Sequence, residues 1–112
     1  MSPRTQYLLE MAAATDRLTR AVNSGDNRRY ADDDLYRYAI AFLWLRLSEP
    51  ATRLLALRLV DERTVPTWRS LNVIRNSLAH HRDEEIAYGR LWHELPETLT
   101  AVGDDLDHLL AA

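Results

Sequence analysis

Apolar residues recur along the chain at intervals of three and four, which is the spacing of one face of an α-helix. No stretch alternates apolar and polar residues for long enough to indicate a β-strand. Only three glycines and four prolines interrupt the 112 residues. The pattern therefore predicts an all-α domain whose helices are joined by short connections.

The first predicted helix covers residues 5–23, where the three-four spacing runs from Tyr7 or Leu8 through Leu18 to Val22. The segment NSGDN follows directly and contains none of the apolar residues that would continue the stripe. Gly25 within it is expected to end the helix in the left-handed conformation that glycine adopts without strain.

The second predicted helix begins at the aspartates of residues 32–34, because their carboxylates can cap free N–H groups and complement the helix dipole. Its buried face is expected to comprise Leu35, Ala39, Phe42, Leu43 and Leu47. Pro50 has no backbone N–H, so we expect a kink or a break near Ser48. Beyond the proline, Leu54, Leu55 and Leu59 continue the apolar stripe.

The third predicted helix begins at Pro66 or Thr67, and its buried face is formed by Trp68, Leu71, Ile74 and Leu78. A fourth is expected to be capped by Asp83, with two glutamates in its first turn, and to extend to the end of the chain with a bend at Pro96. Together the elements predict one domain, residues 1–112, folded as an up-and-down bundle of four to five helices.

The composition indicates an ordinary globular protein, with 46% hydrophobic and 28% charged residues. No apolar run approaches the ~18 residues that a membrane span needs. The first residues lack the apolar core and cleavage site of a signal peptide. Because the chain has no cysteine, it can form neither a disulfide nor a thiolate metal site, and we expect a cytoplasmic protein.

Charge is distributed unevenly, although the formal net charge is only −3. Residues 63–82 carry four arginines and no acid, whereas residues 83–112 carry one arginine and eight acids. The basic stretch favours a local phosphate contact, and the overall balance does not indicate a general polyanion binder.

That basic stretch contains the segment VIRNSLAHHRDEE, which brings Arg75, Asn76 and His80 close together in sequence. Asn76 and His80 are four residues apart and share a helix face. Arg75 and His80 are five residues apart, which separates them by about 140° around a helix axis. Two arrangements could bring them together: the helix ends near His80, or a second copy of the chain completes the site across a two-fold axis.

These side chains suit phosphodiester chemistry without a metal. A histidine can take a proton from an RNA 2′-OH or give one to the leaving oxygen. An arginine stays protonated and can hold phosphate oxygens, and an asparagine can orient the imidazole or the substrate. The neighbouring Arg69, His81 and Arg82 are candidates for RNA binding. The alternative is that these cationic residues only stabilise the C-terminal end of a helix.

A longer set of residues favours the first interpretation. Trp68, the Arg75-Asn76 pair and His80 are followed by an acidic helix start, Trp92 and Leu95-Pro96. This ordered set, over residues 65–99, resembles the C-terminal half of HEPN domains of the HepT type. LSEPA at 47–51 is similar to the family's Gly-Glu-Ala segment. Glu49 matches the family's glutamate, whereas Ser48 and Pro50 differ from the residues on either side of it.

The resemblance implies a helical bacterial protein that dimerises, with the arginine and histidine of both subunits lining one cleft. Members of this family are metal-independent ribonucleases, often toxins encoded beside a minimal nucleotidyltransferase antitoxin. By position, Arg75 and His80 would be catalytic and Asn76 a supporting polar residue. RNA would be the substrate, and no cofactor or metal is implied.

One position departs from the family pattern. HepT-type proteins commonly carry a tyrosine two residues after the histidine, where the antitoxin attaches a nucleotide, and this chain has Arg82 there. Tyr88, six residues further on, is a candidate substitute. The departure keeps two alternatives open: a catalytically inactive module that binds a nucleotidyltransferase or RNA, and a helical dimerisation unit without a ligand.

Overall fold

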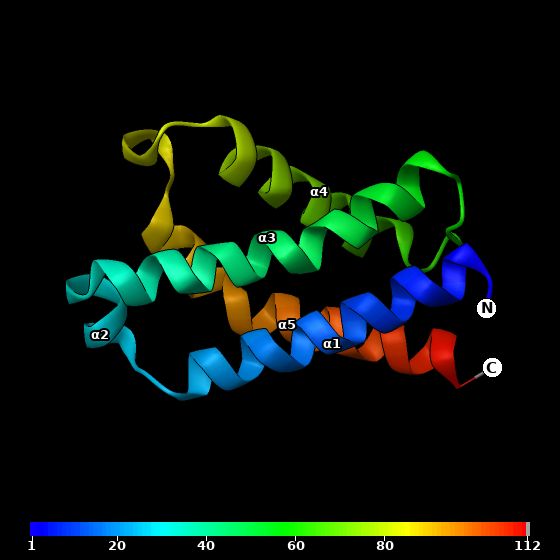
Figure 1. Cartoon of the computed structure of the whole chain (residues 1–112), viewed down its shortest axis with the longest axis horizontal. Coiled ribbons are helices and arrows are strands. Elements are labelled where there is room, and N and C mark those ends of the chain that lie inside the picture. The colour runs from blue at the N-terminus through cyan, green and yellow to red at the C-terminus, as the bar shows by residue number, and fades with distance from the viewer. Residues whose placement is uncertain (112) are drawn as a thin grey trace.

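The structure is a computed structural model that describes residues 1–111 and consists of helices joined by short connections (Figure 1). The elements are α1 (Pro3–Asn23), α2 (Asn27–Asp32), α3 (Asp34–Ala56), α4 (Val65–His80), the short 3₁₀ helix η1 (Asp83–Glu85) and α5 (Tyr88–Leu110). The four long helices run alternately in opposite directions, and both ends of the chain lie at the same end of the bundle (Figure 1). The predicted all-α, up-and-down bundle is confirmed.

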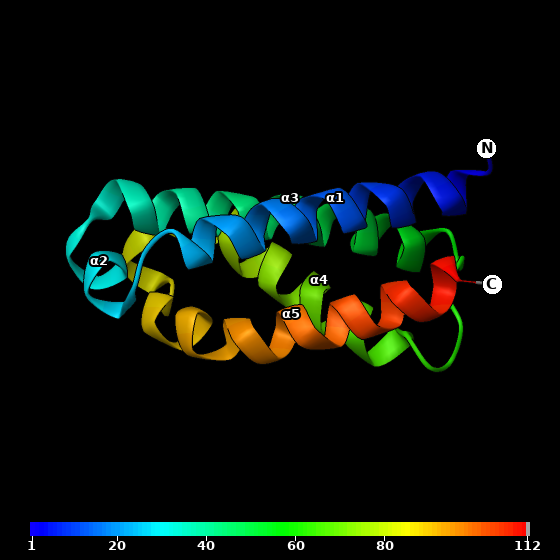
Figure 2. The ribbon, with the colours of Figure 1, turned by 90° about the horizontal axis from the view of Figure 1, so that it is seen from below.

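Helix α3 is the centre of the arrangement. It packs against α1 on one side and α4 on the other, and α5 lies against α1 and α4 (Figure 2). The core side chains come from all four long helices: Leu8, Met11, Leu18, Ile40, Trp44, Leu47, Leu54, Trp68, Leu71, Leu95, Val102 and Leu106. In α4 the predicted face is confirmed, because Trp68, Leu71 and Ile74 are buried.

The buried face of α3 differs from the prediction. Leu35 is 81% exposed and Phe42 is 60% exposed, so both lie on the outer side of the helix. Ala39 is exposed as well, and only Leu43 and Leu47 of the predicted set contact the core. The buried residues include the predicted Leu47 and Leu54, and those that were not predicted are Tyr36, Ile40, Trp44, Ser48, Pro50 and Ala51. The prediction chose the wrong face of the helix because α3 carries apolar residues on nearly every side.

Neither internal proline breaks a helix. Helix α3 continues past Pro50 to Ala56, so the break predicted near Ser48 is not observed. The Ser48 hydroxyl donates a hydrogen bond to the Trp44 carbonyl at 2.8 Å, one turn back. Helix α5 likewise continues past Pro96. Because Pro50 is buried in the bundle, packing around it offsets the hydrogen bond that it cannot make.

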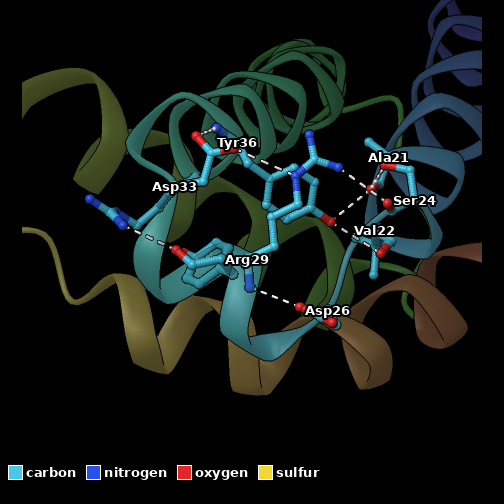
Figure 3. Close-up of polar contacts among 9 residues, drawn as sticks. Ala21, Val22, Ser24, Asp26, Arg29, Asp33 and Tyr36 are labelled. Atoms are coloured by element: carbon cyan, nitrogen blue, oxygen red, sulfur yellow. Dashed lines mark hydrogen bonds and ion pairs between the residues drawn. The ribbon is translucent and has the colours of Figure 1, made fainter.

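The corner between α1 and α3 contains α2, which the apolar spacing did not predict (Figure 3). Asp26 caps α2 by accepting a hydrogen bond from the Arg29 backbone N–H at 2.8 Å. The Tyr36 hydroxyl donates to the carbonyls of Ala21 and Val22, at 2.8 and 3.1 Å, and so closes the end of α1 (Figure 3).

Gly25 does not adopt the left-handed conformation predicted for it, since no glycine has a positive φ within residues 1–111. The C-cap of α1 is Ser24, in right-handed helical geometry. A Cβ at position 25 would lie 2.6 Å from Cζ of the Tyr36 ring. A glycine is therefore needed here because the tyrosine ring packs against its α-carbon.

The connection from α4 to α5 also corrects a prediction. Asp83 begins only the three-residue helix η1, and α5 begins at Tyr88. At its other end α4 begins at Val65, within two residues of the predicted start. Over residues 1–111, no helix combines the length and the apolar character that crossing a membrane requires.

Candidate functional site

The outer face of α4 carries a stripe of four exposed side chains: Arg69, Val73, Asn76 and His80. At 100° per residue these positions fall within about 60° of one another around the axis. Val73, in the middle of the stripe, is 68% exposed. We call these four residues the α4 stripe; it combines cationic and amide groups with one exposed apolar side chain.

Arg75 lies on a different side of α4 from this stripe and is partly buried. Its Nη1 donates a hydrogen bond to Oδ1 of the adjacent Asn76 at 3.2 Å. Its Nε is buried and has no hydrogen-bond partner among the described residues. A buried donor without a partner costs about 1–3 kcal/mol, so the guanidinium lies in a site where an added acceptor would stabilise it.

His80 is the last helical residue of α4, and the chain leaves the helix at His81, with φ −89° and ψ 149°. Because the helix is regular through His80, the angle of about 140° between Arg75 and His80 is retained within one chain. No hydrogen bond joins the two side chains in residues 1–111, and the imidazole of His80 is exposed. A single protomer therefore brings Arg75 together with Asn76 and leaves His80 separate.

The three residues considered for RNA binding differ in how free their charges are. Arg69 is exposed and belongs to the α4 stripe. The His81 ring lies 3.3 Å, through Nδ1, from the Ser77 hydroxyl. Arg82 pairs with Glu84 at 3.6 Å and with Glu85 at 3.8 Å. The acidic residues that follow the motif thus offset the charge of Arg82 and leave that of Arg69 available.

A cluster that the sequence did not indicate lies beside the end of α4. The Asp83 carboxylate accepts hydrogen bonds from the hydroxyls of Tyr38, at 3.1 Å, and Tyr88, at 2.6 Å. Burial, followed by the hydrogen bond to Asp83, raises the pKa of Tyr88, and the same hydrogen bond raises that of Tyr38. Tyr88 therefore stays protonated, and its hydroxyl is already engaged. No spacing rule pairs positions 45 residues apart.

Two grooves on the described residues do not include the candidate residues. A groove of about 690 Å³ runs between α1 and α3 and is lined by Arg17, Phe42 and Arg46, among others. A second one, of about 410 Å³, is bordered by Trp92. Neither contains Arg75, Asn76 or His80. If the candidate residues form a cleft, a second chain must provide its other wall.

No group of three or more potential metal ligands occurs among residues 1–111. Asp105 is buried, although its neighbour Asp104 and the nearby Asp107 are exposed. It accepts a hydrogen bond from the Thr67 hydroxyl at 2.7 Å and lies 3.8 Å from Arg63. This carboxylate links α5 to the start of α4.

The three tryptophans are structural in this fold. Trp44 and Trp68 are fully buried. Trp92 is partly exposed, stacks on Tyr30 with ring centroids 4.4 Å apart, and donates from Nε1 to Asn27 at 2.6 Å. Trp44 and Trp68 therefore cannot stack on a base, and one face of the Trp92 ring is already covered by Tyr30.

Comparisons with protein-family models, with curated proteins and with solved structures found no match to this chain, so its function has to be argued from its own residues.

Proposed function

We propose that the chain is a metal-independent endoribonuclease, a HepT-like toxin of the HEPN class, that acts as a homodimer. His80 would be the general acid or base, Arg75 would hold the phosphate, and Asn76 would orient the reacting groups. A minimal nucleotidyltransferase would be its antitoxin. The observation that carries the proposal is the α4 stripe, because Asn76 and His80 are exposed on one face beside a partly buried arginine.

The dimer follows from the separation of Arg75 and His80. A two-fold axis close to the α4 stripe would pack Val73 of one chain against the same region of its partner. That packing would cover a side chain that is 68% exposed in the single chain. It would also bring His80 of one chain toward Arg75 of the other, which one helix cannot do with its own residues.

The chemistry assigned to these residues is a transesterification at phosphorus. His80 in its neutral form removes the proton from the 2′-OH, the 2′-oxygen attacks the adjacent phosphorus, and the bond to the 5′-oxygen breaks. The leaving oxygen takes its proton from water, so each site uses one imidazole and one guanidinium. Arg75 stabilises the negative charge that builds up on the non-bridging oxygens.

The first test is an RNA-cleavage assay in EDTA with three proteins: wild type, His80→Ala and His108→Ala. His108 is exposed and lies on α5, so its variant controls for the loss of a surface imidazole. We expect cleavage by wild type and His108→Ala, and a loss of at least a hundredfold in His80→Ala, which is the usual range for a general acid or base. Equal rates in all three would reject the assignment.

The second test asks whether the site needs two chains. Arg75→Ala and His80→Ala chains are denatured together in equal amounts, refolded and assayed. Half of the dimers are then mixed, and each mixed dimer holds one complete pair, so about a quarter of wild-type activity should return. Refolding either variant alone should give none. If verified mixed dimers recover no RNA-cleavage activity, the two residues act within one chain.

A second candidate is a binding module of the same fold that does not cleave RNA. It is favoured by the absence of any hydrogen bond to His80 within residues 1–111, since a catalytic imidazole is commonly oriented by a partner group. This alternative predicts co-purification with a nucleotidyltransferase or with RNA, and no cleavage by the wild type. Cleavage that one substitution at His80 abolishes would exclude it.

A further inference from the structure

The segment between α4 and α5, residues 81–87, follows His80 directly and is largely exposed. Inside it, Glu85 N–H donates to Arg82 and Ile86 N–H donates to Asp83. At its ends, His81 N–H donates to Ser77 of α4, and the carbonyls of Ile86 and Ala87 accept from the first turn of α5. The Arg82 N–H is likewise bound within the segment, to the Glu85 carboxylate at 2.9 Å. These bonds shape the turn and join its two ends to α4 and α5, but they do not attach its middle to the bundle.

Asp83 provides that attachment. Its Oδ2 accepts the hydroxyl of Tyr38 on α3 at 3.1 Å, and its Oδ1 accepts the hydroxyl of Tyr88 at the start of α5 at 2.6 Å. Within residues 1–111, the bond to Tyr38 is the only hydrogen bond that ties the segment to α3. Both oxygens of one exposed carboxylate are thus held by groups on two different helices.

The two tyrosines are themselves held in place. Their rings pack edge to face with centroids 6.1 Å apart. The Arg37 guanidinium lies over both, 5.6 Å from the centroid of Tyr38 and 5.5 Å from that of Tyr88. Arg37 donates to the carbonyl of Tyr30 at 3.0 Å, and the Tyr30 hydroxyl donates to the Tyr88 carbonyl at 2.8 Å. Asp83 is therefore bound to a corner that packing already fixes.

From this arrangement we propose that Asp83 is a positioning residue for His80: by binding Tyr38 and Tyr88, it fixes where α4 ends and so where the imidazole lies. Only two residues, His81 and Arg82, separate it from His80, where α4 ends. Without these two hydrogen bonds the exposed segment is free to move, and the last turn of α4 loses the constraint at its C-terminal side. The catalytic consequence rests on the proposed function, whereas the placement of His80 does not.

The test uses variants that each remove one oxygen atom, Tyr38→Phe and Tyr88→Phe, together with Asp83→Ala. Tyr7→Phe is the matched control, because the Tyr7 hydroxyl makes no hydrogen bond within the described residues. The readouts are amide exchange of residues 80–86 and the ring signals of His80 in the intact protein by NMR. His108, far along α5, is the internal reference.

We expect amide exchange of residues 80–86 to be about tenfold faster in each tyrosine variant, and the His80 ring signals to shift or broaden. The His108 signals and the Tyr7→Phe protein should match wild type. The double variant Asp83→Ala/Tyr88→Phe should exchange its amides about as fast as Asp83→Ala alone, because the Tyr88 hydroxyl has already lost its acceptor. Unchanged exchange and unchanged His80 signals in Asp83→Ala would overturn the proposal.

RNA cleavage gives a separate readout. If the wild type cleaves RNA, Asp83→Ala should lower kcat with little change in KM, since the imidazole is misplaced and the substrate contacts are kept. If kcat fell equally in Asp83→Ala and in the control Tyr7→Phe, the cause would be a general loss of structure, and the positioning role would be overturned. If the wild type does not cleave RNA, the proposed function fails, and the NMR experiment still decides the placement of His80.

Discussion

Replacing Gly25 with alanine should destabilise the protein strongly, although the change adds only one methyl group. The new Cβ would lie 2.6 Å from Cζ and 2.7 Å from the hydroxyl oxygen of Tyr36. The ring has little room to retreat, because the Arg29 guanidinium lies 4.2 Å from its centroid on one face. Moving the ring would also break its hydrogen bonds to the carbonyls of Ala21 and Val22.

The magnitude follows from these contacts. Overpacking costs about 1–3 kcal/mol, and each lost hydrogen bond costs about 1 kcal/mol more. We therefore expect the free energy of unfolding to fall by about 3 kcal/mol, as measured by urea denaturation followed by circular dichroism. For a chain of this length the midpoint of thermal unfolding should fall by roughly 10 °C or more.

Gly103→Ala is the matched control, since no atom lies within 4 Å of the Cβ position in the middle of α5. Alanine favours a helix over glycine by about 0.5–1 kcal/mol, so this variant should be more stable than wild type. The two identical substitutions should thus act with opposite signs. A Gly25→Ala protein within 0.5 kcal/mol of wild type would show that the close approach of the tyrosine ring does not restrict this position.

Three further outcomes are expected. Trp44→Ala should lower the free energy of unfolding by about 3–5 kcal/mol in urea denaturation, because this side chain is buried. Phe42→Ala should lower it by less than 0.5 kcal/mol, because Phe42 lies on the outer side of α3, and similar losses in the two variants would reject this orientation of the helix. Thr67→Val should cost about 1–2 kcal/mol, because buried Asp105 loses its hydroxyl donor, and no loss would mean that the bond contributes nothing. Burial raises the pKa of Tyr30 from 10.0 to about 12, so the folded state keeps this proton while the unfolded chain loses it. Stability should therefore fall by at most about 3 kcal/mol as the pH rises from 10 to 12, and the fall should be smaller in Tyr30→Phe; an equal fall would contradict the assignment.

The sequence predicted the helices where the apolar spacing was unambiguous. Helix α4 has apolar residues at Trp68, Leu71 and Ile74, and the residues between them are polar except Val73, so both its position and its buried face were correct. Helix α3 is apolar on most sides, and spacing alone could not choose which side faces the core. The choice depends on tertiary packing: Tyr36 reaches the end of α1, and Trp44 fills the centre.

The remaining differences have local causes. Helix α2 has six residues, mostly polar, and depends on the cap of Asp26 and the burial of Tyr30 rather than on an apolar stripe. Asp83 follows the rules for a helix cap, and yet it binds two hydroxyls brought to it by the fold. For the candidate site, the sequence predicted that Arg75 and His80 lie on one helix, and α4 contains both. How a second chain would meet them is not encoded in the geometry of one helix.

The corner where Trp92 meets α2 also has a consequence for the order of folding. The bond between Asn27 and Trp92 joins residues 65 apart, whereas the bond between Thr52 and Asn72 that links α3 to α4 joins residues only 20 apart. Closing the longer loop costs about 1 kcal/mol more in chain entropy. The α3–α4 hairpin should therefore form first, and the docking of Trp92 on Tyr30 should come last and be the first contact to open.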